Sequence, residues 1–582
     1  MDIYTFDLAP TNTHFQIPFD LTEKAFHQWL NSLASAPDLE RAQQLLLALQ
    51  AINKEKTLPA AKKSLLLESV YKILSVFLKP LHTTLLNSTL PLSPEEQSSI
   101  EHIVWIYAEL ANGFARCITK KSSRDNAQTL FYGLQSSIIV YTHISGVYQL
   151  PFPNFWKQSY LFYGFACNLG IQDLNIKQHD FHSDTVNKAF KHLLALYHCG
   201  LEQFRPRDIV TISACMEKHT SMMLIDKKIT SSNAVQYSAF DLKTDTPPTP
   251  LARFEKTEKS ALRFFSAYLA AAKICKNVYA ESPGTGILKA INYENILQAS
   301  KTLSFSQKRK FTRFKDQEIK SGIIGFKNII DELVKSSSLS PATTPLAKTK
   351  TYDPRLAEGW KTPDLELVAE GYESLDVMKG KLTLGNFFTE QQNQLTQVQK
   401  VFKANNHNYS LDKNIWNNAS DAEQQESSSI PHSALNISDN SIKGYKIIFN
   451  TADNTAQLQI GDIIGIKNKT SIEVGIIHRI RQLTEHKLQL GIKLLTLESE
   501  LAYISLPKRD SIYAWALFLP GIKALNSEDS IIFNDNQFQC GEFIDLHRSG
   551  QEVVSCRLSK LLHISCAASH IKLFNPKVLN EL

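Results

Sequence analysis

The sequence predicts a multidomain α+β protein, with an N-terminal all-α helical array followed by a C-terminal antiparallel β-barrel and a second small β unit. Up to about residue 335, apolar residues recur at helical spacing. After residue 433 the apolar period shortens to two, which is typical of strands that bury one face. Two stretches rich in Ser, Thr, Asn and Gln lie between these patterns and have the composition of linkers.

The composition is that of a globular protein large enough for several domains. At roughly 150 residues per domain, the 582 residues correspond to about four units, or to fewer large ones. Hydrophobic residues make up 43% and charged residues 21%, which excludes disorder of the whole chain. The formal charge of +6 is small for this length, so a protein that coats nucleic acid is excluded, whereas a local anion site is not.

The cysteines and the N-terminus predict a cytoplasmic protein. None of the eight cysteines forms a Cys-x-x-Cys pair, and most lie in apolar runs, as buried free thiols do. Asp2 and Asp7 stand where a signal peptide needs basic residues. The longest stretch without charge, residues 126–156, is interrupted by polar side chains and predicts a buried helix rather than a membrane span.

Composition and period together predict the domain boundaries. They are a helical domain at 1–335, a linker at 336–350, a middle segment at 351–404, a second linker at 405–433, a β-barrel at 434–500 and a second β unit at 501–582.

The helix with the clearest sequence signal begins after Ser93. Ser93 is a suitable N-cap, Pro94 suits the first helical position, and Glu96 completes a capping box. A second helix is predicted to start near Asp184 and to end at Gly200. Short connections between helices favour antiparallel neighbours, hence a stacked array. Further helical patterns cover about 39–53, 62–79, 127–145, 258–280 and 315–335.

Consecutive strands predict the barrel. Apolar residues alternate cleanly over 487–494, and this strand pairs with 471–481 across a turn at 482–485. Two more strands are predicted at 444–449 and 458–466. Short strands that follow one another with turn signals between them are typical of small antiparallel barrels.

A polar motif stands directly before the first of these strands. Asp439, Ser441 and Gly444 follow the pattern [Asp/Asn]-x-Ser-x-x-Gly. Two residues that are two apart on an extended segment share a face, so the carboxylate and the hydroxyl can meet one ligand edge. The glycine permits close approach of another backbone. An Asx- or Ser-turn that introduces a strand is the alternative interpretation.

The succession of this motif, a strand, a Gly-Asp turn at 461–462, a basic strand and a Leu-Gly-Ile strand at 490–492 resembles the PilZ domain. PilZ domains are six-stranded barrels that bind the bacterial second messenger cyclic di-GMP. The resemblance covers about residues 435–500, and a long helical region ahead of the barrel is similar to a group of atypical PilZ proteins. It implies cyclic di-GMP as the ligand, no other cofactor, and ligand-binding roles for Asp439, Ser441 and Gly444.

The arginines depart from the family pattern. PilZ receptors typically carry Arg-x-x-x-Arg shortly before the barrel, whereas no arginine lies between Arg355 and Arg479. Arg479 and Arg481 share one face of a predicted strand and are therefore the candidate phosphate ligands. A guanidinium fork also matches the O6 and N7 acceptors of guanine. Solvated strand charges are the alternative interpretation for both.

The predicted function is that of a non-enzymatic signalling protein. Its PilZ-like barrel senses cyclic di-GMP and relays the signal to a protein partner through the helical domain. The alternative is an adaptor with a degenerate barrel and no small ligand. The sequence shows no nucleophile with its base, no phosphate-binding loop and no metal-ligand spacing, so we expect no catalysis, no metal and no DNA partner.

Overall fold

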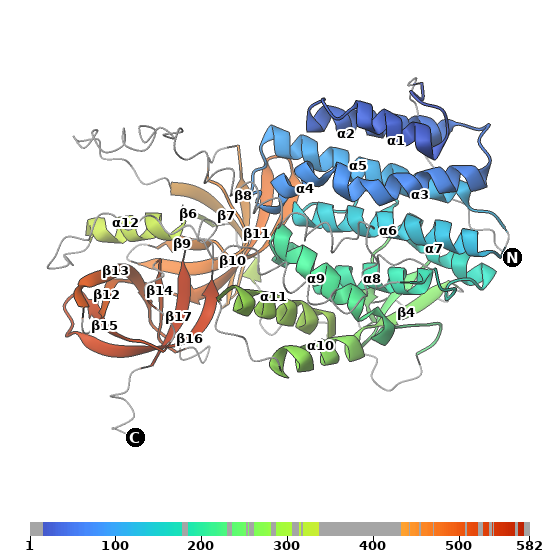
Figure 1. Ribbon diagram of the computed structural model, residues 1–582. Coiled ribbons are helices and arrows are strands. Elements are labelled where there is room, and N and C mark those ends of the chain that lie inside the picture. The colour runs from blue at the N-terminus through green and yellow to red at the C-terminus, as the bar shows by residue number, and fades with distance from the viewer. Residues whose placement is uncertain are drawn as a thin grey trace. The chain divides into compact units, whose positions relative to one another are not determined.

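Figure 1 shows the computed structural model of the chain. It describes residues 16–120, 122–176, 184–229, 236–251, 254, 261–280, 287–304, 314–315, 318–336, 432–441, 443–452, 456–468, 471–506, 509–521, 528–534, 538, 541–564 and 568–574. These residues fall into two compact units that divide between Lys308 and Arg309. The predicted fold class is confirmed, since a helical region precedes antiparallel β-barrels.

The N-terminal unit consists mainly of helices. They are α1 (Glu23–Ser32), α2 (Asp38–Lys54), α3 (Ala60–Phe77), α4 (Lys79–Leu86), α5 (Pro94–Cys117), α6 (Arg124–Gly146), α7 (Phe155–Leu169), α8 (Val186–Cys199), α9 (Pro206–Lys218), α10 (Tyr268–Ala280) and α11 (Ile287–Ser304), with the 3-10 turns η1 (Leu201–Gln203) and η2 (Thr220–Met222). A small antiparallel sheet has the order β1 (Leu224–Asp226), β4 (Leu262–Ser266), β2 (Ser238–Asp241), β3 (Thr249–Pro250).

Local capping signals set several helix starts. The predicted capping box is confirmed: the Ser93 hydroxyl accepts from the Glu96 amide, and the Glu96 carboxylate accepts from the Ser93 amide. Thr22, Ser123 and Thr185 cap α1, α6 and α8 in the same way with their hydroxyls. The predicted stop at Gly200 is also confirmed, since this glycine takes the left-handed conformation after α8.

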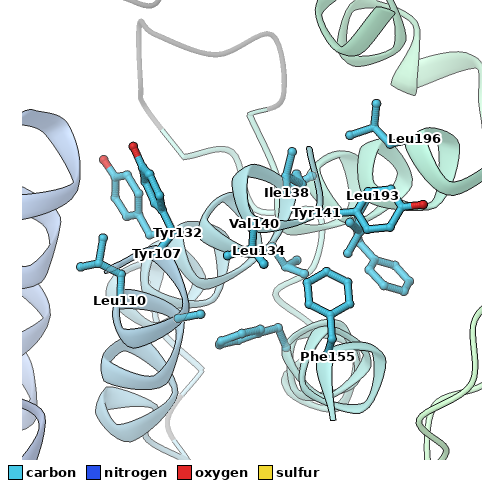
Figure 2. Close-up of a cluster of buried hydrophobic side chains, with 14 of the residues drawn as sticks. Tyr107, Leu110, Tyr132, Leu134, Ile138, Val140, Tyr141, Phe155, Leu193 and Leu196 are labelled. Atoms are coloured by element: carbon cyan, nitrogen blue, oxygen red, sulfur yellow. The ribbon is translucent and has the colours of Figure 1, made fainter. Parts of the chain in front are cut away.

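Buried aromatic and aliphatic side chains of α5 to α8 form the centre of the helical core. Tyr132 and Phe114 stack with ring centroids 5.6 Å apart, and Tyr163 stacks on Phe190 at 4.3 Å. Figure 2 shows part of this core, with labelled residues from four helices: Tyr107, Leu110, Tyr132, Leu134, Ile138, Val140, Tyr141, Phe155, Leu193 and Leu196. The aromatic run of α7 therefore packs inside the unit.

The predicted helix over 258–280 begins later than its sequence pattern suggests. Leu262–Ser266 is a strand, and α10 starts only at Tyr268. Strand β4 pairs with β1 on one side and with β2 on the other. Pairing with a strand on each side favours the extended conformation here, although the apolar residues of this short segment have helical spacing.

Six strands of the second unit close into a first barrel. They are β6 (Ile319–Ile324), β7 (His432–Ser441), β8 (Gly444–Asn450), β9 (Ile463–Lys467), β10 (Ile472–Thr484) and β11 (Lys487–Thr496), and a seventh, short strand, β5 (Phe314–Lys315), lies outside the ring. The ring runs β6-β7-β8-β11-β10-β9 and returns to β6, while β5 extends the β6 side of the ring along β7. The predicted pairing of 471–481 with 487–494 is confirmed as β10 with β11.

The first strand of this barrel comes from a segment predicted as helix, 315–335. Ile319–Ile324 is instead strand β6, and only Phe326–Ser336 is helical, as α12. Gly322 lies so close to β7 that a Cβ there would be 2.4 Å from Cδ1 of Leu435. The helical region therefore does not extend to residue 335, because 314–336 belongs with the barrels.

The two predicted linkers and the middle segment lie largely outside the described residues. Ser336 ends α12, and His432 and Ser433 already belong to β7. Residues 337–431, between these two elements, are not described.

The second β unit is a closed barrel of its own. Its strands are β12 (Glu500–Leu506), β13 (Arg509–Leu519), β14 (Ser530–Phe533), β15 (Phe543–Arg548), β16 (Val554–Ile564) and β17 (Ser569–Phe574). The ring order is β12-β13-β14-β17-β16-β15. When the six strands of each barrel are numbered in chain order, the order around either ring is first, second, third, sixth, fifth, fourth. The second unit therefore repeats the topology of the first barrel.

Helix α12 joins the two barrels through one apolar cluster. Phe326, Ile329 and Ile330 of α12 are buried there. They pack with the outer faces of both barrels, whose buried residues are Ile323, Ile463, Ile472 and Val474 in the first and Leu501, Leu517, Leu519, Ile532 and Ala568 in the second. We call this cluster the α12 joint.

The polar face of α12 is tied to the first barrel by a single carboxylate. Oε1 of Glu332 lies 2.7 Å from Nζ of Lys467 on β9, and Oε2 lies 3.7 Å from Nε2 of His432 on β7. The hydrogen bond from Lys467 lowers the pKa of Glu332. Strands β7 and β9 are thus both held against the helix.

Candidate ligand-binding site

The polar motif forms the hairpin between β7 and β8. Asp439 is the register partner of Lys446, and Ser441 is the partner of Gly444. The Ser441 hydroxyl donates to the Gly444 carbonyl over 3.2 Å, which closes the turn. Because partners across a ladder share a face, the Asp439 and Ser441 positions face outward, on the side opposite the buried Ile437.

A glycine is needed at position 444 because the neighbouring strand leaves no space for a side chain. Its φ is +148°, and a Cβ at this position would lie 1.8 Å from the Ile492 carbonyl oxygen of β11. The amide of Leu494 donates to the carbonyl of Lys443 over 2.9 Å at the same crossing. The glycine therefore permits the close approach of β11. This contact fixes the hairpin against the barrel.

A row of outward positions crosses the barrel wall from the hairpin. Asp439 on β7 pairs with Lys446 on β8, which pairs with Gly491 on β11, which pairs with Arg479 on β10. At about 4.8 Å per strand, Arg479 lies roughly 14 Å from Asp439 along this row. We call these four positions the outer row; Gly491 is the position without a side chain.

The two predicted arginines lie at the far end of the outer row. Arg479 is exposed and Arg481 is half-buried, on either side of the fully buried Ile480. Nε of Arg481 is buried without a hydrogen-bond partner among the described residues. The structure thus brings Asp439, Ser441 and Gly444 together in one hairpin, whereas Arg479 and Arg481 stand three strands away.

Polar side chains close the inside of the barrel behind the hairpin. The Tyr445 hydroxyl donates to the buried Glu473 over 2.6 Å, and Nδ2 of Asn468 donates to the same carboxylate over 2.6 Å. Nζ of Lys320 on β6 donates to Asn468 over 3.2 Å and lies 5.4 Å from the centre of the Tyr445 ring. This network links β6, β8 and β10 through polar contacts.

The chain that enters the first barrel runs beside the motif. Phe314 and Lys315 of β5 pair with Asn440 and Asp439 of β7. The sequence just before β5 reads Arg309-Lys-Phe-Thr-Arg313, an Arg-x-x-x-Arg pattern. Arg313 directly precedes Phe314 in the sequence. Arg309 and Arg313 themselves lie outside the described residues.

The expectation that no Arg-x-x-x-Arg pattern precedes the barrel places the first strand after the Asn- and Ser-rich linker. The first strand is instead β6, ahead of residues 325–431, and Arg309-x-x-x-Arg313 stands before it in the sequence. The pattern Arg309-x-x-x-Arg313 before the short segment Ile319–Ile324 is a sequence signal for this start of the barrel. Sequence spacing alone does not identify Lys446 and Gly491 as members of the outer row.

The described residues contain neither a metal-ligand cluster nor a membrane-spanning helix. Over these ranges, no three His, Cys, Asp or Glu side chains are grouped so that they can hold a metal ion. No described helix is both long and apolar enough to cross a bilayer.

Two family models match the chain. Residues 24–228 match the N-terminal domain of the cyclic-di-GMP receptor FimW, and residues 373–500 match the middle PilZ domain of the same receptor. Together the two ranges span more than half of the 582 residues. No curated protein matches the sequence. The PilZ match includes β7 to β11, with the hairpin and the outer row, and confirms the PilZ resemblance.

Proposed function

The chain belongs to the FimW family of cyclic-di-GMP receptors, and we propose on that premise that it binds cyclic di-GMP at the β7–β8 hairpin of the first barrel. The observation that carries this proposal is the pairing of Phe314 and Lys315 with Asn440 and Asp439. It brings the chain that follows Arg313 alongside the motif although residues 325–431 separate them in sequence, which supports a site built from both.

The chemistry of these residues suits a guanine dinucleotide. Arg309 and Arg313 supply guanidinium forks for the phosphates and for the O6 and N7 edge of a guanine. Asp439 accepts hydrogen bonds from guanine N–H groups, and Ser441 adds a hydroxyl next to it. Arg479, at the far end of the outer row, is a secondary cation for the ligand.

The position of the arginine pair suggests how binding is relayed. Arg309 and Arg313 lie in the nine residues between the end of α11 and the start of β5, which connect the helical unit to the first barrel. A ligand held by these arginines and by the hairpin shifts the equilibrium between arrangements of the protein that differ in ligand affinity.

The helical unit offers a surface for the protein partner in this relay. Trp105 of α5 is 48% exposed and stacks on Phe152 with ring centroids 5.7 Å apart, and the neighbouring Leu150 is 56% exposed. Exposed aromatic side chains next to an exposed leucine are typical of protein interfaces. We expect Trp105→Ala to weaken partner capture without changing nucleotide affinity.

Calorimetric titration of cyclic di-GMP into the full chain tests the proposed function. We expect micromolar or tighter binding, weakened about tenfold or more by Asp439→Ala, because one charge-assisted hydrogen bond contributes about 1.5–3 kcal/mol. Arg557→Ala, an exposed arginine of the second barrel, is the matched control and should leave the affinity unchanged. Absence of heat and of thermal stabilisation at millimolar ligand would instead support an adaptor without a small ligand.

A further inference from the structure

The outer face of the first barrel carries an irregularity at His478. Ile477 pairs with Ile492 and Arg479 pairs with Gly491, so β10 has one more residue here than β11. His478 is that extra residue, in a β-bulge. Bulges re-aim a side chain and are frequent next to binding sites.

The imidazole of His478, redirected by the bulge, lies against Gly491. A Cβ at Gly491 would lie 3.3 Å from Nε2 and 3.6 Å from Cε1 of His478, and 3.2 Å from Cβ of Arg479. The tip of the ring therefore occupies the space that a side chain on β11 would fill. Any larger residue at 491 would press on the imidazole, so the glycine and the histidine form a matched pair.

Packing alone does not account for this pair. His478 is only half-buried, and a glycine within a strand weakens the strand. The bulge also interrupts the ladder between two strands that pair regularly from Ile480 to Gln482. Two unfavourable local features, the glycine and the bulge, thus accompany one flat, polar ring on the barrel surface.

The ring lies within the outer row. Gly491, which it covers, is two strands from Asp439, or about 10 Å along the barrel wall. Cyclic di-GMP carries its two bases on opposite sides of a ring of two riboses and two phosphates. With the phosphates and one base held at the hairpin, the other base is within reach of the neighbouring strands.

We propose that His478, held in place by Gly491, is a base-stacking residue of the first barrel and contacts a guanine of the bound dinucleotide. This inference rests on the proposed function, since it requires cyclic di-GMP at the β7–β8 hairpin. An imidazole offers an aromatic face to the base, and base–aromatic stacking contributes substantially to nucleotide affinity.

Titration of cyclic di-GMP into full-length variants tests the pair. His478→Ala should weaken binding about tenfold, the loss typical of one stacked base. Gly491→Ala should weaken it to a similar extent, because the added Cβ displaces the ring. The double variant should bind no more weakly than either single variant, since both changes remove the same contact. His478→Phe keeps a flat ring and should bind within about threefold of the wild type.

A matched histidine and a melting curve serve as controls. His547 lies on the outer face of the second barrel, and His547→Ala should leave cyclic di-GMP affinity unchanged. Thermal melting of each variant shows that the barrel is folded. If the wild type binds and Arg313→Ala loses binding, yet His478→Ala binds within about twofold of the wild type, the stacking role is wrong and the proposed function stands. If the losses in the double variant add, the pairing with Gly491 is wrong. If the wild type does not bind, the proposed function fails first.

Discussion

The two barrels share one strand order and differ in what their surfaces carry. In the first barrel, the hairpin between the second and third strands of the ring holds Asp439, Ser441 and Gly444. In the second barrel, the corresponding connection between β13 and β14, residues 520–529, contains no such motif. No arginine lies between Arg481 and Arg509, so no Arg-x-x-x-Arg pattern precedes β12.

This difference shows that the ring topology and the ligand site are separable. The second barrel closes without the motif, and it contributes Leu501, Leu517 and Leu519 to the α12 joint. A fold persists when its polar site residues are absent, because the buried face of each strand sets the closure. The second barrel therefore shares the ring topology of the first but not the residues of its candidate site.

Glycine substitutions should give the largest difference in stability loss between the two barrels. Gly444→Ala places a Cβ 1.8 Å from a backbone oxygen, so β8 or β11 must move. We expect a loss of at least about 3 kcal/mol in local stability. Gly550 has φ +67° with open space around it, and Gly550→Ala should cost only about 1–2 kcal/mol. Amide hydrogen exchange of β8 and of β15 measures both effects. Equal losses would show that the hairpin of the first barrel has no special constraint.

The α12 joint should show how far the barrels depend on one another. Ile329 is fully buried, and Ile329→Ala should cost about 2–4 kcal/mol. Because the joint contacts both barrels, amide exchange should accelerate in β9 and β12 alike. Val334 on the same helix is 38% exposed, and Val334→Ala is the control, with an expected loss below about 1 kcal/mol. Exchange that accelerates in β9 alone would mean that the second barrel stands independently.

The polar contact at the joint should have the smallest effect, and one that depends on pH. Glu332 has a lowered pKa in the folded protein, mainly through the hydrogen bond from Lys467. Its contribution is therefore present above the ordinary glutamate pKa and is lost as the pH falls through the folded value. At pH 7, Glu332→Gln should cost no more than about 1 kcal/mol. The difference from the wild type in urea denaturation should shrink towards zero at pH 3; a constant difference would rule out the ion pair.

Local patterns in the sequence predict local structure well. The capping box at Ser93 and the alternation over 487–494 each depend on neighbouring residues, and both are found in the structure. The hairpin motif is visible for the same reason. Strand β6 is not, because its partners β7 and β9 lie beyond residues 325–431 and its apolar residues also fit a helix. The position of Arg309 and Arg313 ahead of the barrel is hidden for the same reason, since it depends on which strand comes first.

The outer row shows a second limit of sequence reasoning. Asp439, Lys446, Gly491 and Arg479 are neighbours only through three successive strand pairings. The bulge at His478 shifts the register by one residue, which no alternation pattern reveals. Spacing along one strand correctly put Arg479 and Arg481 on a shared face but gave no distance to the hairpin.

One measurement tests the account most directly: calorimetric titration of cyclic di-GMP into the full chain with either arginine pair replaced. Arg309→Ala with Arg313→Ala should reduce affinity more than about 100-fold, because two guanidinium contacts are lost. Arg479→Ala with Arg481→Ala should reduce it less than about tenfold. The opposite ranking, with binding that survives the first double variant and is lost in the second, would contradict the assignment of the ligand site to the β7–β8 hairpin and the chain that enters beside it.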